Sequence, residues 1–171
     1  MISILRIGHR PFRDKRITTH VALVARAFGA ESIYIDTRDE KITETILSVC
    51  NRFGKGFTIQ TGVSPMRIIK EWSGQIIHLT MYGETLKNSL KLLDKQKDLL
   101  IIVGAEKVPA QFYDLADINV SVGNQPHSEV AAIAVFLDRF TNHAWEQKTF
   151  DGKMNIIPAK HGKKVVGKDE D

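Results

Sequence analysis

The chain has 171 residues, of which 43% are hydrophobic and 26% are charged, and its formal net charge at pH 7 is +4. This length and composition predict one globular domain with one well-filled core. A membrane-spanning helix is excluded because no apolar run reaches the roughly 18 residues that it needs, and no secretory leader is expected, so we predict a cytoplasmic protein that does not enter a membrane.

Apolar, β-branched runs alternate with helical patterns along the chain. Strands are expected at residues 2–7, 32–36, 57–61, 76–80, 98–103 and 117–122. Helices are expected over residues 18–29, 39–53, 64–72, 84–95 and 128–142, with a short turn near 110–116. The alternation predicts an α/β fold with a mostly parallel sheet and helices on both faces. The single cysteine, Cys50, falls at helical spacing and is predicted to be a small buried side chain.

The connection after the first strand is strongly basic. Its sequence RIGHRPFRDKR, residues 6–16, contains five lysine or arginine residues and one opposing acid, Asp14. A solvated loop is the ordinary explanation for such a run, whereas a surface that binds nucleic-acid phosphates is the functional one. Gly8 and Pro11 argue against an extended helix here. The sequence leaves both explanations open.

Three of the predicted strands lead into a glycine turn, at Gly83, Gly104 and Gly123. Ligands of open parallel sheets usually bind beyond the carboxyl ends of the strands, where glycine lets the backbone approach a ligand closely. The first strand is not followed by a G-x-G-x-x-G fingerprint, and the sequence has no G-x-x-x-x-G-K-[ST] loop. This disfavours a dinucleotide-binding or P-loop enzyme. The histidines show no metal-ligand spacing, so no metal site is predicted.

Three stretches, in this order, resemble the motifs of the SPOUT methyltransferase superfamily: RDKRITTHVALVARAFGA, LIIVGAEKVP and DINVSVGNQPHSEVAAIAVFLDR. The match spans about residues 1–142. Within the superfamily, the three stretches most resemble the archaeal family of tRNA cytidine 2′-O-methyltransferases that acts in the T-loop. The resemblance implies a SPOUT-type fold in which about residues 76–142 form a C-terminal trefoil knot. Residues 143–171 would be an extension with a hairpin that turns at Asp151-Gly152 and a disordered end.

The same resemblance implies S-adenosylmethionine as the cofactor, tRNA as the substrate and 2′-O-methylation of the T-loop cytidine at position 56. Backbone groups would do most of the cofactor recognition. The residues implied at this site are Leu79, Gly104, Ala105, Glu106, Lys107, Val108, Val122, Gly123, Asn124, Gln125, Pro126, His127, Ser128 and Glu129. A helix cap explains Ser128 equally well, and hydrogen bonding to loop backbone explains His127 better than acid–base chemistry does.

Catalytic roles are implied for Arg16 from the first motif, for Glu106 as an orienting carboxylate and for Asn119 from the third motif. Arg10 and Arg13, together with Arg16, would clamp RNA phosphates. An arginine stays protonated in ordinary protein environments, so it is better suited to position a phosphate than to remove a proton.

The family also implies a homodimer, and small alanines in helices 18–29 and 128–142 suit close packing across a two-fold axis. Two other functions stay open. One is a SPOUT methyltransferase that acts on a base or on ribosomal RNA, and the other is a non-catalytic RNA-binding module without affinity for the methyl donor. A measurement of cofactor binding would distinguish the RNA-binding module from a methyltransferase. Mapping of the modified nucleotide would distinguish the two kinds of SPOUT methyltransferase.

Overall fold

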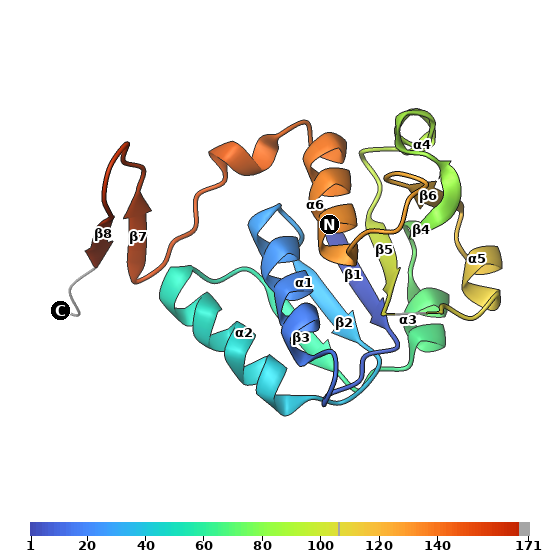
Figure 1. The fold of residues 1–171 in the computed structure, drawn as a ribbon, viewed down its shortest axis with the longest axis horizontal. Coiled ribbons are helices and arrows are strands. Elements are labelled where there is room, and N and C mark those ends of the chain that lie inside the picture. The colour runs from blue at the N-terminus through green and yellow to red at the C-terminus, as the bar shows by residue number, and fades with distance from the viewer. Residues whose placement is uncertain (106, 168–171) are drawn as a thin grey trace.

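The computed structural model describes residues 1–105 and 107–167 (Figure 1). Six strands form one sheet in the order β3-β2-β1-β5-β4-β6, and every neighbouring pair is parallel. The strands are β1 (Ile2–Ile7), β2 (Ser32–Ile35), β3 (Thr58–Thr61), β4 (Gln75–Thr85), β5 (Leu99–Gly104) and β6 (Ile118–Ser121). The parallel sheet predicted from the alternating pattern is therefore confirmed.

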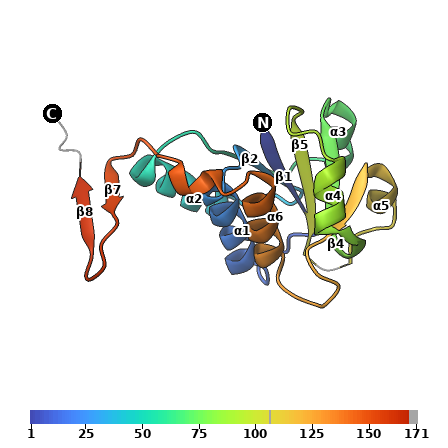
Figure 2. The same cartoon turned by 90° about the horizontal axis from the view of Figure 1, so that it is seen from above.

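Helices cover both faces of this sheet, as predicted (Figure 2). They are α1 (Lys15–Ala27), α2 (Glu40–Phe53), α3 (Pro65–Glu71), α4 (Leu86–Leu92), α5 (Gln111–Leu115) and α6 (Glu129–Phe140). Apolar side chains of α1, α2, α4 and α6 share one core cluster with the sheet. Those of α3 and α5 share a second cluster on the opposite face. Each face of the sheet is buried because the strands are apolar on both sides.

Local sequence signals account for the helix ends. The side chain of Asp39 accepts a hydrogen bond from the backbone of Ile42, which caps α2. Ser64 caps α3, and Pro65 is the first residue of this helix, a position at which proline is favoured. Cys50 is 4% exposed, as predicted for a small buried side chain.

Strand β4 is the largest departure from the predicted elements, because it runs to Thr85 instead of ending at residue 80. Its pairing with β6 shifts register between Leu79 and Glu84, and both residues align with Val120. A Cβ atom on Gly83 would lie 2.5 Å from the carbonyl carbon of Asn119. Gly83 is thus needed where β6 approaches β4 and does not end the strand, and the helix predicted from residue 84 begins later, at Leu86.

The segment between β6 and α6 crosses from the edge of the sheet to its centre. Strand β6 is the edge strand beyond β4, whereas α6 packs against α1 on the other half of the sheet. On the way, the side-chain amide of Asn124 donates a hydrogen bond to the carbonyl oxygen of Met81 at 2.8 Å. The trefoil knot implied for this region stays a prediction.

The C-terminal segment contains a hairpin, but its predicted turn at Asp151-Gly152 is wrong. Strands β7 (Met154–Ile157) and β8 (Lys164–Gly167) pair antiparallel and are joined by residues 158–163. A Cβ on Gly152 would lie 2.5 Å from the backbone nitrogen of Gly54, so this glycine serves close packing against the end of α2. In both views the hairpin stands beyond α2, apart from the main sheet (Figures 1 and 2). The predicted disordered end includes residues 168–171, which lie outside the described residues.

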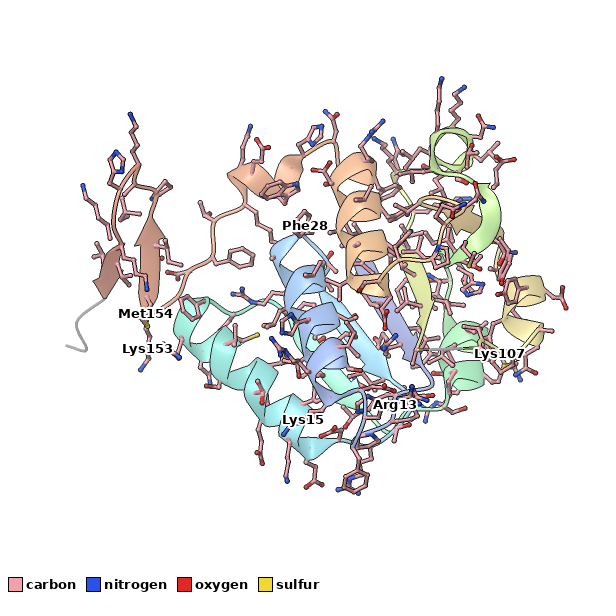
Figure 3. All side chains as sticks on the ribbon, viewed as in Figure 1. Arg13, Lys15, Phe28, Lys107, Lys153 and Met154 are labelled. Carbon is pink, nitrogen blue, oxygen red and sulfur yellow. The ribbon has the colours of Figure 1, made fainter. Side chains whose placement is uncertain are left out.

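The first part of the extension packs on α1 and α2. The ring of Trp145, in the short helix η1 (Ala144–Gln147), lies 4.8 Å from the ring of Phe28 between centroids. The guanidinium of Arg26 donates hydrogen bonds to the carbonyls of Phe53 and Gly54 and stacks on a further ring of the extension. Figure 3 labels Phe28, which directly follows α1, and Met154, the first residue of β7. The extension is therefore attached to the core by aromatic and cation–π contacts.

Removal of a core ring should destabilise the fold. Phe136 of α6 is fully buried and stacks on Phe140 at 5.6 Å between centroids, whereas Phe12 is fully exposed. We expect Phe136→Ala to lower the free energy of unfolding in urea by about 3–5 kcal/mol, because the lost transfer energy adds to the cost of a cavity. Phe12→Ala is the matched control and should change stability little. Equal losses in the two variants would contradict this assignment of the core.

A buried histidine should make stability depend on pH. His78 of β4 and Asn119 of β6 are register partners, and Nδ1 of His78 lies 3.0 Å from Oδ1 of Asn119. Burial lowers the pKa of His78, and the hydrogen bond to Asn119 opposes that shift without cancelling it. The unfolded chain then binds more protons than the native protein once the pH falls below about 6.5.

The free energy of unfolding should therefore decrease between pH 7.5 and pH 5.5 in urea titrations. We expect His78→Gln, which keeps an amide donor for Asn119, to show a smaller decrease than the wild type over the same interval. An unchanged pH dependence in this variant would show that other groups cause it.

Candidate functional site

An open pocket of about 430 Å³ lies at the carboxyl ends of β4, β5 and β6, beside the first turn of α6. Most residues predicted to bind the cofactor line it: Leu79, Gly104, Ala105, Lys107, Val108, Val122, Gln125, Pro126, His127 and Glu129. They come from segments far apart in the chain, which the parallel sheet brings to one edge. Their role in binding stays a prediction, but their clustering is a finding.

The remaining predicted cofactor residues do not line this pocket or are not described. Asn124 is turned toward the carbonyl of Met81, and the hydroxyl of Ser128 accepts a hydrogen bond from the backbone of Val130 and caps α6. Gly123 has a φ of 155°, and its backbone donates to the hydroxyl of Ser121. These contacts hold the loop that carries the lining residues. Glu106 lies outside the described residues.

Several lining residues were not predicted: His78, Thr80, Met81, Tyr82, Val103, Tyr113, Val120 and Ala132. Most of them belong to the continuation of β4 or to the strands beneath it. The rings of His78 and Tyr113 meet edge to face at 4.5 Å between centroids. The missed signal is the length of β4, because residues 78–82 line the pocket in succession and the strand continues past residue 80 to Thr85.

The pocket combines an apolar wall with two opposite charges. Val103, Val120 and Ala132 supply apolar surface from three elements. Lys107 contributes an ammonium group from the loop after β5, and Figure 3 shows it at the same edge of the sheet. Glu129, in the first turn of α6, carries the only carboxylate among the described residues that line the pocket.

Glu129 is ion-paired with an arginine inside the protein. Oε1 of Glu129 lies 2.7 Å from a terminal nitrogen of Arg6, whose side chain is 0% exposed, whereas that of Glu129 is 22% exposed. The contact is an ion pair and not an aligned hydrogen bond, and Nε and Nη1 of Arg6 have no hydrogen-bond partner among the described residues. Burial lowers the pKa of Arg6, and the carboxylate of Glu129 opposes this shift most strongly. A buried cation thus stands behind the pocket wall.

The basic loop, residues 8–14, joins β1 to α1, and hydrogen bonds to other segments hold it in place. The backbone nitrogens of Gly8 and His9 donate to the carboxylate of Asp36, at 2.6 and 3.2 Å. The buried ring of His9 bridges two further side chains, with Nε2 3.0 Å from Asp39 Oδ2 and Nδ1 2.9 Å from the hydroxyl of Thr18. These contacts tie the start of the loop to the end of β2 and to the first turns of α1 and α2.

The three arginines predicted to bind RNA lie on this loop and at the start of α1. Arg10 donates two side-chain hydrogen bonds to Asp14, at 2.8 and 3.0 Å, and these bonds hold the pKa of Asp14 below its usual value. Arg13 and Arg16 are exposed, and Figure 3 labels Arg13 and Lys15 at the end of the molecule where α1 begins. None of the three arginines lines the pocket. They form a surface beside it.

Asn119, a predicted catalytic residue, also lies outside the set of residues that line the pocket. Its Oδ1 is 3.0 Å from His78, and its Nδ2 donates to the carbonyl of Tyr113 at 2.9 Å. Both polar atoms of the amide are engaged, so Asn119 supports the pocket through His78 and Tyr113. A direct catalytic role for it stays a prediction.

The basic loop and the pocket share an edge of the sheet. The backbone nitrogen of Ala105 donates to the carbonyl of Ile7, and a Cβ on Gly8 would lie 3.7 Å from that of Ala105. The basic loop therefore begins beside a residue that lines the pocket. Within residues 1–105 and 107–167, no cluster of three potential metal ligands occurs, and no helix has the length and apolar character needed to cross a bilayer.

Comparisons with known proteins agree with this arrangement. A family model described as tRNA ribose 2′-O-methyltransferase, aTrm56, matches residues 53–166. The tRNA (cytidine(56)-2′-O)-methyltransferase of Thermococcus kodakarensis is 53% identical over 174 residues, which cover 97% of each chain. The enzyme of the same name from Picrophilus torridus is 54% identical over 165 residues, which cover 96% of this chain and 48% of that protein. The chain thus spans about half the length of the Picrophilus relative and nearly all of the Thermococcus one.

A solved structure shows the same fold. The SpoU methyltransferase AviRb from Streptomyces viridochromogenes, in complex with the cofactor AdoMet, superposes with a TM-score of 0.56 at 13% identity. The alignment covers 86% of this chain and 57% of that one. The α/β fold with a parallel sheet that the resemblance implied is therefore the fold of this SpoU methyltransferase, whereas the knot stays a prediction. By its matched segment and its relatives, the chain belongs to the family of archaeal tRNA ribose 2′-O-methyltransferases, aTrm56.

Proposed function

We propose that the protein methylates the 2′-hydroxyl of a tRNA ribose, with S-adenosylmethionine as the methyl donor and the T-loop cytidine at position 56 as the target. One observation carries this proposal: a ligand pocket and an anchored basic loop meet at Gly8 and Ala105. Transfer between a small donor and a nucleic acid requires two such sites side by side. Membership of the family and the names of the relatives support the choice of donor and target.

The pocket fits the proposed donor in size and chemistry. Its volume of about 430 Å³ lies within the usual range for small-molecule sites. The apolar wall suits a flat base, and Lys107 suits the carboxylate of the amino-acid part. The turn at Gly104 and Ala105 offers backbone groups at the same edge. When bound, S-adenosylmethionine supplies an electrophilic methyl group.

The basic loop supplies the proposed RNA surface. Arg10, Arg13 and Arg16 would bind phosphates, which places the ribose without reading its base. Phe12 lies among these arginines and is fully exposed, so its ring is free to stack on an unpaired base. Because His9 and its partners already hold this loop, little conformational entropy is lost when RNA binds.

A homodimer through α1 and α6 is part of the proposal. The two helices pack side by side, and the outer face of α6 leaves Ala131 and Val135 exposed, the latter by 43%. A second copy would cover this small apolar face by close helix packing. The two pockets would then lie next to the shared interface, because Glu129 begins the same helix.

Donor binding can be tested by calorimetric titration with S-adenosylmethionine. We expect micromolar binding by the wild type, and we expect a Gly104→Val, Asn124→Ala double variant to abolish it. The valine enters the pocket and the alanine releases the loop from Met81. Asn51→Ala, on the exposed face of α2, is the control and should bind as the wild type does. Absence of donor binding by the wild type would favour a non-catalytic RNA-binding module.

The target can be tested by incubation with unmodified tRNA and mass mapping of the products. We expect a single methyl group on the ribose of cytidine 56. Arg16→Ala should weaken tRNA binding and lower the slope of log K against log salt by about 1, because one phosphate contact is lost. Arg67→Ala, on α3, should leave the slope unchanged. A methyl group at another nucleotide would show that the enzyme is a SPOUT methyltransferase with a different target.

A further inference from the structure

The proposed reaction needs a group that removes the proton of the ribose hydroxyl, and this inference rests on that proposed function. The arginines of the basic loop stay protonated, so they are poor proton acceptors. Two histidines line the pocket, but the Nδ1 of His78 is engaged with Asn119, and His78 is 1% exposed. The Nδ1 of His127 lies 3.1 Å from the carbonyl of Ser128, on the exposed loop before α6.

Glu129 carries the only carboxylate among the described residues that line the pocket, and an ionised carboxylate can accept a proton. Its partner, Arg6, belongs to β1 and precedes the basic loop by two residues. The carboxylate therefore lies between the pocket and the strand that leads into the loop. Its side chain is 22% exposed, so a ligand can reach it without rearrangement of the core. A hydroxyl presented by phosphates on the basic loop would approach from this side.

Arg6 has the features of a positioning residue. Its guanidinium is fully buried, and Glu129 is the only ion-pair partner that the described residues provide within contact distance. The carboxylates of Asp14 and Asp36 act on it only from farther away. An arginine placed in this way holds the carboxylate of Glu129 in one orientation.

We propose that Glu129 is the general base of the methyl transfer and that Arg6 positions it. The hydroxyl proton passes to the carboxylate of Glu129, and the ribose oxygen forms a bond to the methyl carbon as the bond from that carbon to the donor sulfur breaks, its electron pair staying on sulfur. The positive charge of the donor is lost and the negative charge of Glu129 is neutralised in the same step, so the net charge of the pocket is unchanged. Arg6 stays protonated throughout and touches neither substrate.

The first test compares Glu129→Gln and Glu129→Asp in single-turnover methylation of unmodified tRNA. We expect Glu129→Gln to lower the rate by about 10²–10⁴-fold, the usual contribution of a positioned base. Glu129→Asp should recover at least part of that loss because it keeps a carboxylate. Titration of both variants with S-adenosylmethionine should show dissociation constants within tenfold of the wild type. Glu71→Gln, in the exposed Arg67–Glu71 pair, is the matched control and should keep the wild-type rate.

Loss of the Glu129 carboxylate removes the one ion-pair partner that the described residues give the buried Arg6, so the Glu129→Gln variant is expected to unfold at a lower temperature. A second variant, Arg6→Met with Glu129→Met, removes both charges and should regain the wild-type melting temperature, because apolar side chains replace a buried ion pair without loss. It lacks the base, so its rate should stay as low as that of Glu129→Gln. A merely structural role for the pair predicts instead that rate and stability recover together.

Three results would overturn the proposal: a Glu129→Gln rate within threefold of the wild type, a double variant that regains the wild-type rate, or loss of donor binding in Glu129→Gln by more than tenfold. The last result would make Glu129 a donor-binding residue. A wild-type protein that binds the donor and methylates no tRNA would overturn the proposed function as well. Methylation by the wild type together with a fully active double variant would overturn only the role of Glu129.

Discussion

The parallel pairing of β1 with β5 is the constraint on which the site depends. It aligns Ile2–Ile7 with Leu99–Gly104 at the centre of the sheet, without a shift in register. Because parallel strands end at the same edge, the basic loop after β1 and the turn after β5 become neighbours. A surface for an anion and a pocket for a small molecule are thus adjacent, although neither is near the other in sequence. Any slip of this register would separate them.

The fold was largely predictable because the spacing of apolar residues and the length of each apolar segment distinguish strands from helices in this chain. The two errors share a physical cause. Gly83 and Gly152 both suggested turns, yet each lies where a Cβ would collide with the backbone of a distant segment, β6 in one case and the end of α2 in the other. The local sequence shows where a glycine stands. It does not show whether a turn or the close approach of two backbones requires that glycine.

The site was predictable where motif residues fall on loops, and not where its chemistry lies inside a strand. Ten of the fourteen residues that the resemblance implied for the cofactor line one pocket. Arg6 gave no separate signal, because in RIGHRPFRDKR it looks like one more surface cation. Its burial depends on a partner from α6, more than a hundred residues away. His9 is similar, since its buried position depends on Asp39 and Thr18.

The buried pair of Arg6 and Glu129 is difficult to explain by stability alone. Burial of a guanidinium opposes folding when two of its nitrogens have no hydrogen-bond partner among the described residues, and apolar side chains of similar volume usually do as well or better at such a position. The surrounding core offers such side chains in abundance, with Ile4, Ile35 and Val103 close by on the same face of the sheet. A charge kept in this setting, directly behind a ligand pocket, is best explained by the chemistry of the ligand. One ion pair would then both complete the pocket wall and supply the proposed base.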